Sequence, residues 1–97
     1  MKALSSITSG EILWEDYMKP LGLTQNALAR ALDVPPRRIN EIVLNRRKIT
    51  LDTSLRLGRF FGQSPLFWLN IQTQCDYRQA KALEKKISKT VIPLQIA

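Results

Sequence analysis

The chain lacks the residues on which most catalytic and metal sites depend. Its 97 residues contain no histidine and one cysteine, Cys75. Histidine is the commonest general base and the commonest metal ligand, so we expect no enzyme, no metal site and no cofactor. A lone cysteine cannot form an intrachain disulfide, which fits a reducing cytoplasmic location. We expect Cys75 to pack as a small hydrophobic residue.

Long apolar runs are also missing. No stretch approaches the roughly 20 apolar residues that a membrane span needs. The opening residues, M-K-A-L-S-S-I, lack the apolar segment of a signal peptide. Apolar residues nevertheless make up 44% of the chain, which is enough for one folded domain with a modest core. We therefore expect a folded protein that does not associate with membranes.

Positive charge is abundant and unevenly placed. The formal net charge is +7, which favours a polyanionic partner. Residues 1–29 are slightly acidic, with Lys2 and Lys19 set against three carboxylates. Residues 30–59 carry eight basic side chains against three acidic ones. The basic excess therefore lies on one segment in the middle of the chain.

The spacing of apolar residues predicts an all-α fold, a compact bundle of five or six short helices. The expected helices are residues 11–19 capped by Ser9, residues 25–32 capped by Thr24, one beginning at Pro36, one from Thr50 to Gly62, one beginning at Ser64-Pro65, and one beginning at Asp76. The expected core comprises Ile12, Leu13, Tyr17, Leu21, Leu28, Ala29, Leu32, Val34, Ile39, Ile42, Val43, Leu51, Leu55, Phe60, Phe61, Phe67, Trp68 and Ile71.

The second and third expected helices form a helix-turn-helix. Ala29 is small enough to let a crossing helix approach, and Val34 supplies an apolar residue in the turn. With Ile39, Ile42 and Val43 inward, the helix geometry leaves a polar outer face suited to the major groove of DNA. The predicted base-reading residues are Arg37 and Arg38 for guanine, Asn40 for adenine, Glu41 for cytosine and Leu44 for a thymine methyl group. Glu41 has an alternative role as an ion-pair partner of Arg37, Arg38 or Lys48.

A second set of residues is suited to DNA phosphates. The free N–H groups at the start of the second helix and the basic loop after the third are typical phosphate-binding positions. The predicted phosphate-binding residues are Thr24, Gln25, Asn26, Asn45, Arg46, Arg47 and Lys48. The simpler interpretation of the basic run is a solvated surface. The order of capped helix, turn, proline and basic loop favours DNA binding.

Residues 24–45 resemble the helix-turn-helix of the lambda-repressor-like (XRE) group. Four stretches in order resemble, more narrowly, the HigA-type antitoxins of type II toxin–antitoxin pairs. They are Gly10-Glu11-Ile12-Leu13, Pro20 to Gln25, Val34 to Val43, and Ile49 to Asn70 with the Phe67-Trp68-Leu69-Asn70 run at its end. The family usually has His-Pro where Thr8-Ser9 stand here, and often a small residue in place of Lys48.

The resemblance implies a five-helix repressor-like fold, a homodimer and two functions. Such a protein neutralises a small toxin, commonly a ribosome-dependent mRNA endonuclease, and binds a palindromic operator in double-stranded DNA to repress its own operon. We divide the chain into an N-terminal arm (1–9), a DNA-binding domain (10–77), and a C-terminal helix and tail for dimerisation or partner binding (78–97).

Two interfaces and three alternatives remain open at this point. The segments after Pro65 are expected to dimerise, with Trp68 either in the core or at the dimer seam. The acidic first helix, with Glu11, Glu15 and Asp16, would suit a basic toxin. The alternatives are a stand-alone or phage-type repressor without a toxin, a basic protein that binds nucleic acid without sequence preference, and an enzyme.

Overall fold

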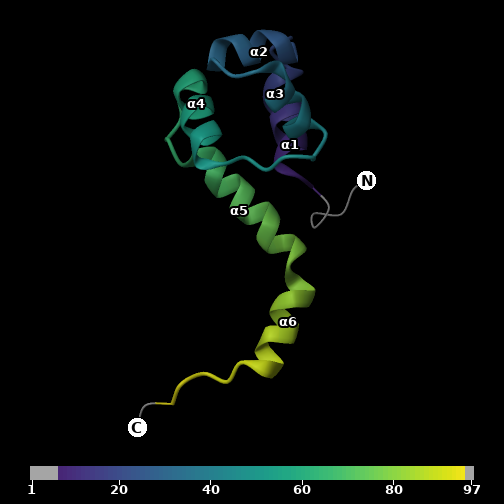
Figure 1. Ribbon diagram of the computed structural model, residues 1–97, viewed down its shortest axis with the longest axis vertical. Coiled ribbons are helices and arrows are strands. Elements are labelled where there is room, and N and C mark those ends of the chain that lie inside the picture. Colours follow the sequence, from purple (N-terminus) through teal and green to yellow (C-terminus); the bar gives the residue numbers. More distant parts are fainter. Residues whose placement is uncertain (1–6, 96–97) are drawn as a thin grey trace.

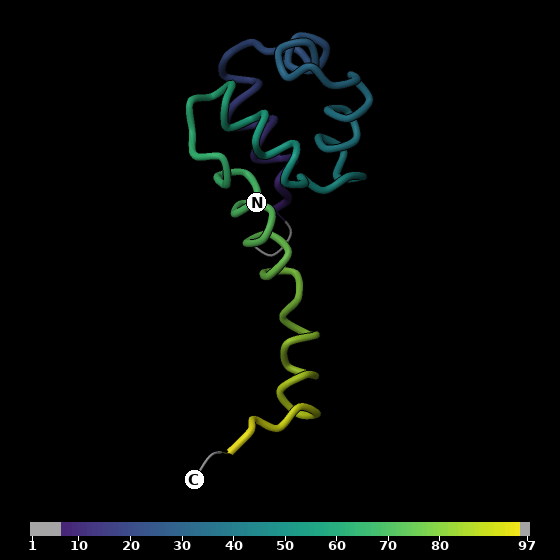
Figure 2. Tube along the Cα trace, turned by 60° about the vertical axis from the view of Figure 1, so that its left-hand side comes forward, coloured from purple at the N-terminus to yellow at the C-terminus, as the bar shows by residue number. Residues whose placement is uncertain are grey.

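The computed structural model describes residues 7–95 and confirms an all-α architecture for them, with no β-strand in that range. Its elements are α1 (Ser9–Ile12), η2 (Leu13–Met18), α2 (Gln25–Leu32), α3 (Pro36–Val43), α4 (Leu51–Phe61), α5 (Phe67–Gln79) and α6 (Lys81–Thr90). The elements from α1 to the start of α5 form a bundle, whereas α6 stands clear of it in two views (Figures 1 and 2). The molecule therefore measures 56 × 32 × 20 Å along its principal axes.

The first helix begins two residues earlier than predicted and has a different cap. Thr8 is the N-cap, and its Oγ1 accepts a hydrogen bond from the N–H of Glu11 at 3.2 Å. Ser9 was expected in that role, but it is the first helical residue, it is buried, and its hydroxyl donates to Gln72. The predicted arm of residues 1–9 thus loses Ser9 to α1, and residues 1–6 lie outside the described residues.

The same helix continues as the π-helical turn η2, which the N–H of Lys19 closes on the carbonyl oxygen of Trp14 at 2.8 Å. The chain then turns at Gly22, whose φ of +64° is in the left-handed region that glycine tolerates. Leu21 lies in this turn and is 66% exposed, so its expected place in the core is wrong. Helical spacing could not place it because the helix has already ended.

The helix-turn-helix core agrees with the sequence. Leu28, Ala29, Ile39 and Ile42 are fully buried, and Val34 is 9% exposed. These residues belong to one hydrophobic cluster that also holds Leu13, Met18, Leu57 and Trp68. The 3.6-residue period therefore identified the inward sides of α2 and α3 correctly.

Helix α4 turns a different face to the core than predicted. Leu51 and Leu55 are 50% and 46% exposed, while Thr53, Ser54, Leu57 and Gly58 are buried. The reason is close packing against the following turn, where the Ser54 hydroxyl donates to the carbonyl oxygen of Pro65 at 2.7 Å. A Cβ added at Gly58 would lie 2.7 Å from the Ser64 carbonyl oxygen. A larger side chain would therefore not fit at Gly58, where the helix meets the turn.

The aromatic residues gather where η2, α4 and α5 meet. Trp68 is fully buried, its ring centroid lies 4.8 Å from that of Tyr17, and its Nε1 donates to Gln63. Trp68 is therefore a core residue, and the alternative placement at a dimer seam is wrong. Phe60 is 43% exposed, contrary to its expected burial.

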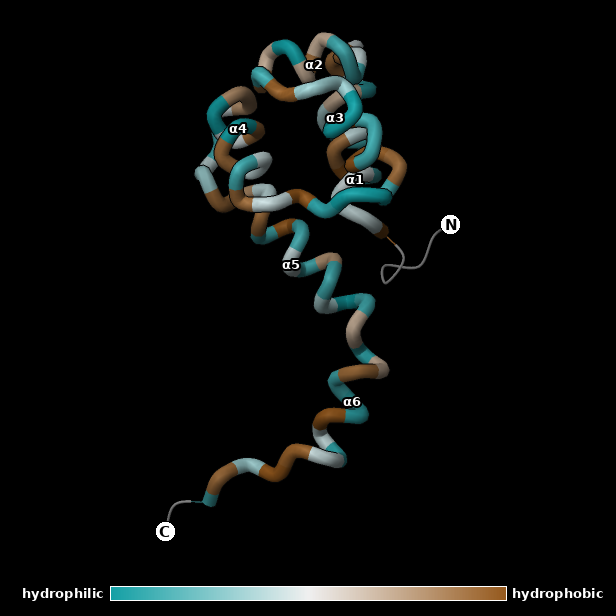
Figure 3. Tube along the Cα trace, viewed as in Figure 1, coloured by the Kyte–Doolittle hydropathy of each residue, from teal (hydrophilic) through white to brown (hydrophobic). Residues whose placement is uncertain are grey.

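Both C-terminal helix starts differ from the predictions. Pro65 and Leu66 form a turn, closed by the N–H of Phe67 on the Ser64 carbonyl oxygen at 3.1 Å, and α5 begins at Phe67. Asp76 was expected to begin the last helix, but α5 runs through it to Gln79, and α6 follows from Lys81. No residue of α6 is buried. Figure 3 shows brown and teal segments alternating along α6, as expected for an amphipathic helix. Among residues 7–95, no element covers its apolar side chains.

Candidate nucleic-acid interface

The turn between α2 and α3 fixes the angle at which the two helices meet. Asp33 ends α2 in the left-handed conformation, with φ +58°, and the N–H of Val34 donates to the Ala29 carbonyl oxygen at 3.0 Å. Pro36 stands in the first turn of α3, where its missing N–H leaves no helical bond unmade. The outward side of α3 is consequently held at a fixed orientation.

Helix α3 presents the predicted polar face. The side chain of Arg37 is 84% exposed, and Asn40 and Leu44 are also exposed. Glu41 is less open, with its side chain 23% exposed. These four residues lie opposite the buried Ile39 and Ile42, as the 100° step per residue requires.

Glu41 joins two of the predicted DNA-contacting arginines. One carboxylate oxygen lies 3.4 Å from Arg37 Nε, and the other lies 2.9 Å from Arg47 Nη2. The ion-pair alternative for Glu41 is therefore confirmed for Arg37, whereas Arg47 is a partner that was not predicted. The pairing neutralises a carboxylate that would otherwise repel phosphates. The other two expected partners pair elsewhere, Arg38 with Asp52 and Lys48 with Asp76.

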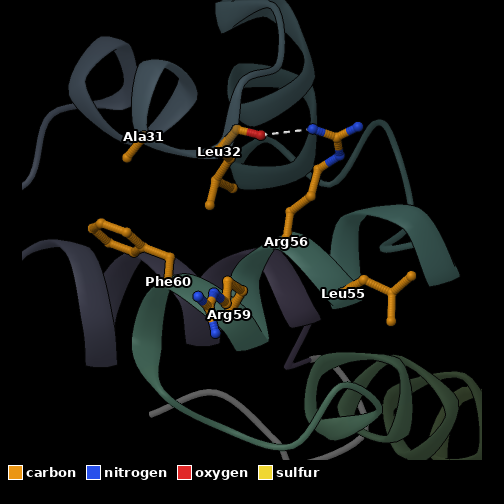
Figure 4. A pocket seen from close by; sticks show the side chains of 6 residues that line it. All are labelled: Ala31, Leu32, Leu55, Arg56, Arg59 and Phe60. Atoms are coloured by element: carbon orange, nitrogen blue, oxygen red, sulfur yellow. Dashed lines mark hydrogen bonds between the residues drawn. The ribbon is translucent and has the colours of Figure 1, made fainter.

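Arg38 points to α4, unlike its neighbour Arg37. Its Nη1 lies 2.6 Å from Asp52 Oδ2, and Arg56 Nε lies 3.0 Å from the same oxygen. Arg56 also donates to the carbonyl oxygen of Leu32 at 2.8 Å, across the groove between α2 and α4 (Figure 4). The hydrogen bonds from Arg56 and Arg38 hold the pKa of Asp52 below its usual value.

The N-terminus of α2 carries the first group of predicted phosphate-binding residues. Thr24 Oγ1 accepts from the N–H of Ala27 at 3.1 Å and caps the helix. Gln25 Oε1 accepts from Asn40 Nδ2 at 3.1 Å, and Asn26 is exposed beside it. Asn40 on α3 and Gln25 on α2 are thus brought together.

The second group lies in the loop after α3. Asn45 is in the left-handed conformation, with φ +59°, and Arg46, Arg47 and Lys48 are all exposed. Lys48 Nζ lies 3.2 Å from Asp76 Oδ1 on α5. The three cations therefore extend from the end of α3 toward α5.

The buried side-chain amide of Gln72, on α5, bonds to the end of this loop. Gln72 is 8% exposed, and its Oε1 accepts hydrogen bonds from the Ser9 hydroxyl and from the N–H of Ile49, the latter at 2.9 Å. Its Nε2 donates to Asp76 Oδ1 at 3.0 Å. A polar cavity of about 250 Å³ opens beside these residues and the basic loop.

Sequence reasoning missed Asp52, Gln72 and Asp76 as parts of the site. The pair Asp52 and Arg56 stands at i, i+4 on a helix, a spacing that typically indicates an ion pair and could have drawn notice. Gln72 gave no signal, because one polar residue on a helix is ordinary. Its role depends on the distance between α5 and the loop, which only the folded chain shows.

Two classes of site receive no support from the described residues. No group of three or more Cys, Asp or Glu side chains there is placed to hold a metal ion. None of the helices within residues 7–95 combines the length and apolar character that a bilayer crossing demands.

A helix-turn-helix family model matches residues 15–69 of the chain. Among relatives, virulence-associated protein I of Dichelobacter nodosus is 50% identical, over 94% of this chain and 83% of the relative. Antitoxin HigA-1 of Vibrio cholerae is 30% identical, over 94% of this chain and 86% of its own length.

The solved structures that resemble this chain include antitoxins of the same HigA type as the sequence relative. The Pseudomonas aeruginosa antitoxin HigA, solved with the higBA promoter, has a TM-score of 0.83 and 38% identity, covering 92% of this chain and 98% of that one. An addiction module antidote protein of the HigA family from Coxiella burnetii has a TM-score of 0.83 and 44% identity, covering 91% and 97%.

Proposed function

Because this chain belongs to the helix-turn-helix family and, within it, to the HigA-type antitoxins, we propose that it binds operator DNA and represses its own promoter. The observation that carries the proposal is the outer face of α3. A rigidly held helix presents Arg37 and Asn40 to solvent, with Leu44 exposed at its C-cap, beside a basic loop. This combination of a polar reading face and adjacent cations is suited to the major groove and its flanking phosphates.

In this proposal the exposed residues of α3 read bases. Arg37 binds guanine O6 and N7, Asn40 pairs with adenine, and Leu44 contacts a thymine methyl group. Glu41 remains a candidate for cytosine N4, and its bonds to Arg37 and Arg47 support a further role in orienting both arginines. Arg38, the fifth predicted reader, is engaged by Asp52 in the free protein.

The phosphate contacts come from both sides of α3. Thr24, Gln25 and Asn26 lie at the N-terminus of α2, where free N–H groups attract anions. On the other side, Asn45, Arg46, Arg47 and Lys48 are exposed in the loop. Contacts of this kind orient the protein on the duplex without reading its sequence.

We further propose a homodimer that binds a palindrome. The apolar residues Leu83 and Ile87 of α6 are 56% and 46% exposed at i, i+4 spacing, which supports burial against a second copy. Pairing through the C-terminal part leaves α3 free on both subunits. A two-fold dimer then requires half-sites centred one helical turn apart, about 34–36 Å.

The second function is neutralisation of a cognate toxin, which we propose to be a small basic mRNA endonuclease. Membership among the HigA-type antitoxins supports a toxin partner. Glu15 and Asp16 are exposed on η2, away from the basic loop in sequence, and offer an acidic surface to a basic protein.

Operator binding is tested by titrating the dimer with DNA from upstream of its own gene and with a scrambled duplex of equal length. We expect own-promoter DNA to bind at least ~10³-fold more tightly at physiological salt. Equal affinities would contradict the proposal and indicate a protein that binds nucleic acid without sequence preference.

The toxin proposal is tested separately. A tagged form of this chain is purified from its native cell, and the proteins that co-purify are identified by mass spectrometry. A small basic protein in fixed ratio, encoded beside this chain, is the expected result. Own-promoter binding with no protein partner would instead establish the alternative, a stand-alone or phage-type repressor.

A further inference from the structure

One exposed carboxylate holds two arginines that come from different helices. Asp52 lies in the first turn of α4, and its Oδ2 is 2.6 Å from Arg38 Nη1 of α3 and 3.0 Å from Arg56 Nε of α4. Both arginines use the same oxygen atom. Asp52 therefore links the first turn of the candidate reading helix to the first turn of its neighbour.

The Arg56 side of this link is anchored. Arg56 Nη1 donates to the carbonyl oxygens of Leu32 and Asp33, at 2.8 and 3.3 Å, where α2 ends. These carbonyl groups lack helical partners, so a guanidinium satisfies them well. Asp52 is thus bound by an arginine that is itself fixed to the end of α2, and the Arg38 side chain that pairs with Asp52 is held in the same place.

Two consecutive arginines consequently differ in availability. The Arg37 side chain is 84% exposed, and within residues 7–95 its ion-pair partner is Glu41 on the same helix. The Arg38 side chain is 26% exposed, and its Nε is buried without a hydrogen-bond partner among the described residues. With Nε buried and Nη1 on Asp52, the Arg38 guanidinium has only its remaining edge open to solvent and cannot extend to a DNA phosphate at full length while the pair is closed.

We infer that Asp52 is a specificity-determining positioning residue, which withholds Arg38 from DNA phosphates and leaves Arg37 to meet the bases. The inference rests on the proposed function of α3 as a reading helix. A freed arginine at the edge of that helix would bind phosphate on any duplex, which adds affinity without sequence information.

The carboxylate is charged throughout the physiological range, because its pKa lies below the usual value. The hold on Arg38 therefore does not depend on pH near neutrality. It does depend on the negative charge, which an isosteric amide removes.

The test compares the wild-type protein with Asp52→Asn on scrambled DNA over a series of salt concentrations. Each phosphate contact adds about 0.9 to the slope of log affinity against log salt. We expect Asp52→Asn to steepen the slope by about that amount and to tighten scrambled-DNA binding several-fold. The affinity for own-promoter DNA should increase less, because the link that holds α3 against α4 is lost. The ratio of own-promoter to scrambled-DNA affinity should therefore fall.

Two further variants distinguish the release of Arg38 from the mere loss of one negative charge as the cause of a steeper slope. In Asp52→Asn with Arg38→Gln, the steeper slope should disappear, because the freed arginine is absent. Glu15→Gln removes one negative charge from another surface ion pair, with Lys19 at the C-terminal end of η2. Because the assay contains no toxin, this variant should leave the slope unchanged. Circular dichroism of each variant confirms that the same helical fold is compared.

A measurement on the wild-type protein covers the case in which Asp52→Asn does not fold. Phenylglyoxal modification mapped by mass spectrometry should label Arg37 several-fold faster than Arg38. Equal labelling of the two, or a steeper slope that persists without Arg38, would overturn the inference. Wild-type protein that shows no preference for own-promoter DNA would instead refute the proposed function, which is a separate outcome.

Discussion

The side-chain amide of Asn40 donates a hydrogen bond to Gln25 Oε1 at 3.1 Å, and so joins the outer face of α3 to the N-terminus of α2. Both residues are predicted DNA contacts, one to a base and one to a phosphate. An amide held by a neighbour is oriented before the DNA arrives, which lowers the entropy lost on binding. One residue proposed to read a base and one proposed to bind a phosphate are thus joined directly by a hydrogen bond.

The first prediction concerns this pair. Because Gln25 orients Asn40, the variants Gln25→Ala and Asn40→Ala should not have independent effects on own-promoter affinity. The double variant should lose less than the two single losses combined, with a coupling of about 0.5–1.5 kcal/mol. Losses that add within error would show that the hydrogen bond is irrelevant to recognition.

A second prediction follows from the close approach of α1 to α3. A Cβ placed on Gly10 would lie 1.8 Å from the carbonyl oxygen of Ile42, so backbone must move to accept it. We expect Gly10→Ala to lower the free energy of unfolding by at least about 3 kcal/mol in urea denaturation. Gly22→Ala is the control, since a Cβ there would meet no atom within 4 Å. Its cost comes only from placing alanine at φ +64°, about 1 kcal/mol. Similar losses for both variants would contradict the packing account.

The third prediction tests Gln72 as the support of the basic loop. Gln72→Ala leaves the N–H of Ile49 and the Ser9 hydroxyl without their acceptor. An unsatisfied buried group costs about 1–3 kcal/mol, so chemical denaturation should show a loss of that size. Gln74→Ala, at an exposed position on the same helix, should change stability by less than about 0.5 kcal/mol. If Gln72→Ala and Gln74→Ala had the same free energy of unfolding, water would replace the Gln72 amide at no cost.

Cys75 gives the fourth prediction. The side chain is 1% exposed, and burial raises the pKa of its thiol above the ordinary value. Native protein at pH 8 should therefore react with iodoacetamide more slowly than urea-unfolded protein, by roughly a hundredfold or more. The unfolded chain loses this proton at lower pH than the folded chain, so alkaline pH should reduce stability. Equal alkylation rates would show that the thiol is accessible.

Sequence periodicity located the DNA-binding unit because its core is built from apolar residues at helical spacing. Leu28, Ala29, Val34, Ile39 and Ile42 are inside as predicted, and Thr24 caps α2. Capping and periodicity are local properties, so they can be read from a short segment. The outward direction of Arg37 and Asn40 follows from the same geometry.

The burial predictions that were wrong concern positions where the distance to a neighbouring element, rather than the type of residue, decides which side chain is buried. In α4 the leucines at positions 51 and 55 face solvent, while Ser54 and Gly58 contact the following turn. A periodic pattern of apolar residues could not reveal that the close neighbour requires small side chains. The engagement of Arg38 by Asp52 was hidden for a related reason, since its partner lies 14 residues away and on another helix.

The measurement that tests the central claim most directly is the affinity of Arg37→Ala for own-promoter and scrambled DNA at one salt concentration. If α3 reads bases through Arg37, the variant should lose about 1–3 kcal/mol on own-promoter DNA, with relaxed preference at one base position. Scrambled DNA should bind nearly as before. An equal loss on both duplexes would make Arg37 a phosphate contact and contradict the assignment of α3 as the reading helix through this residue.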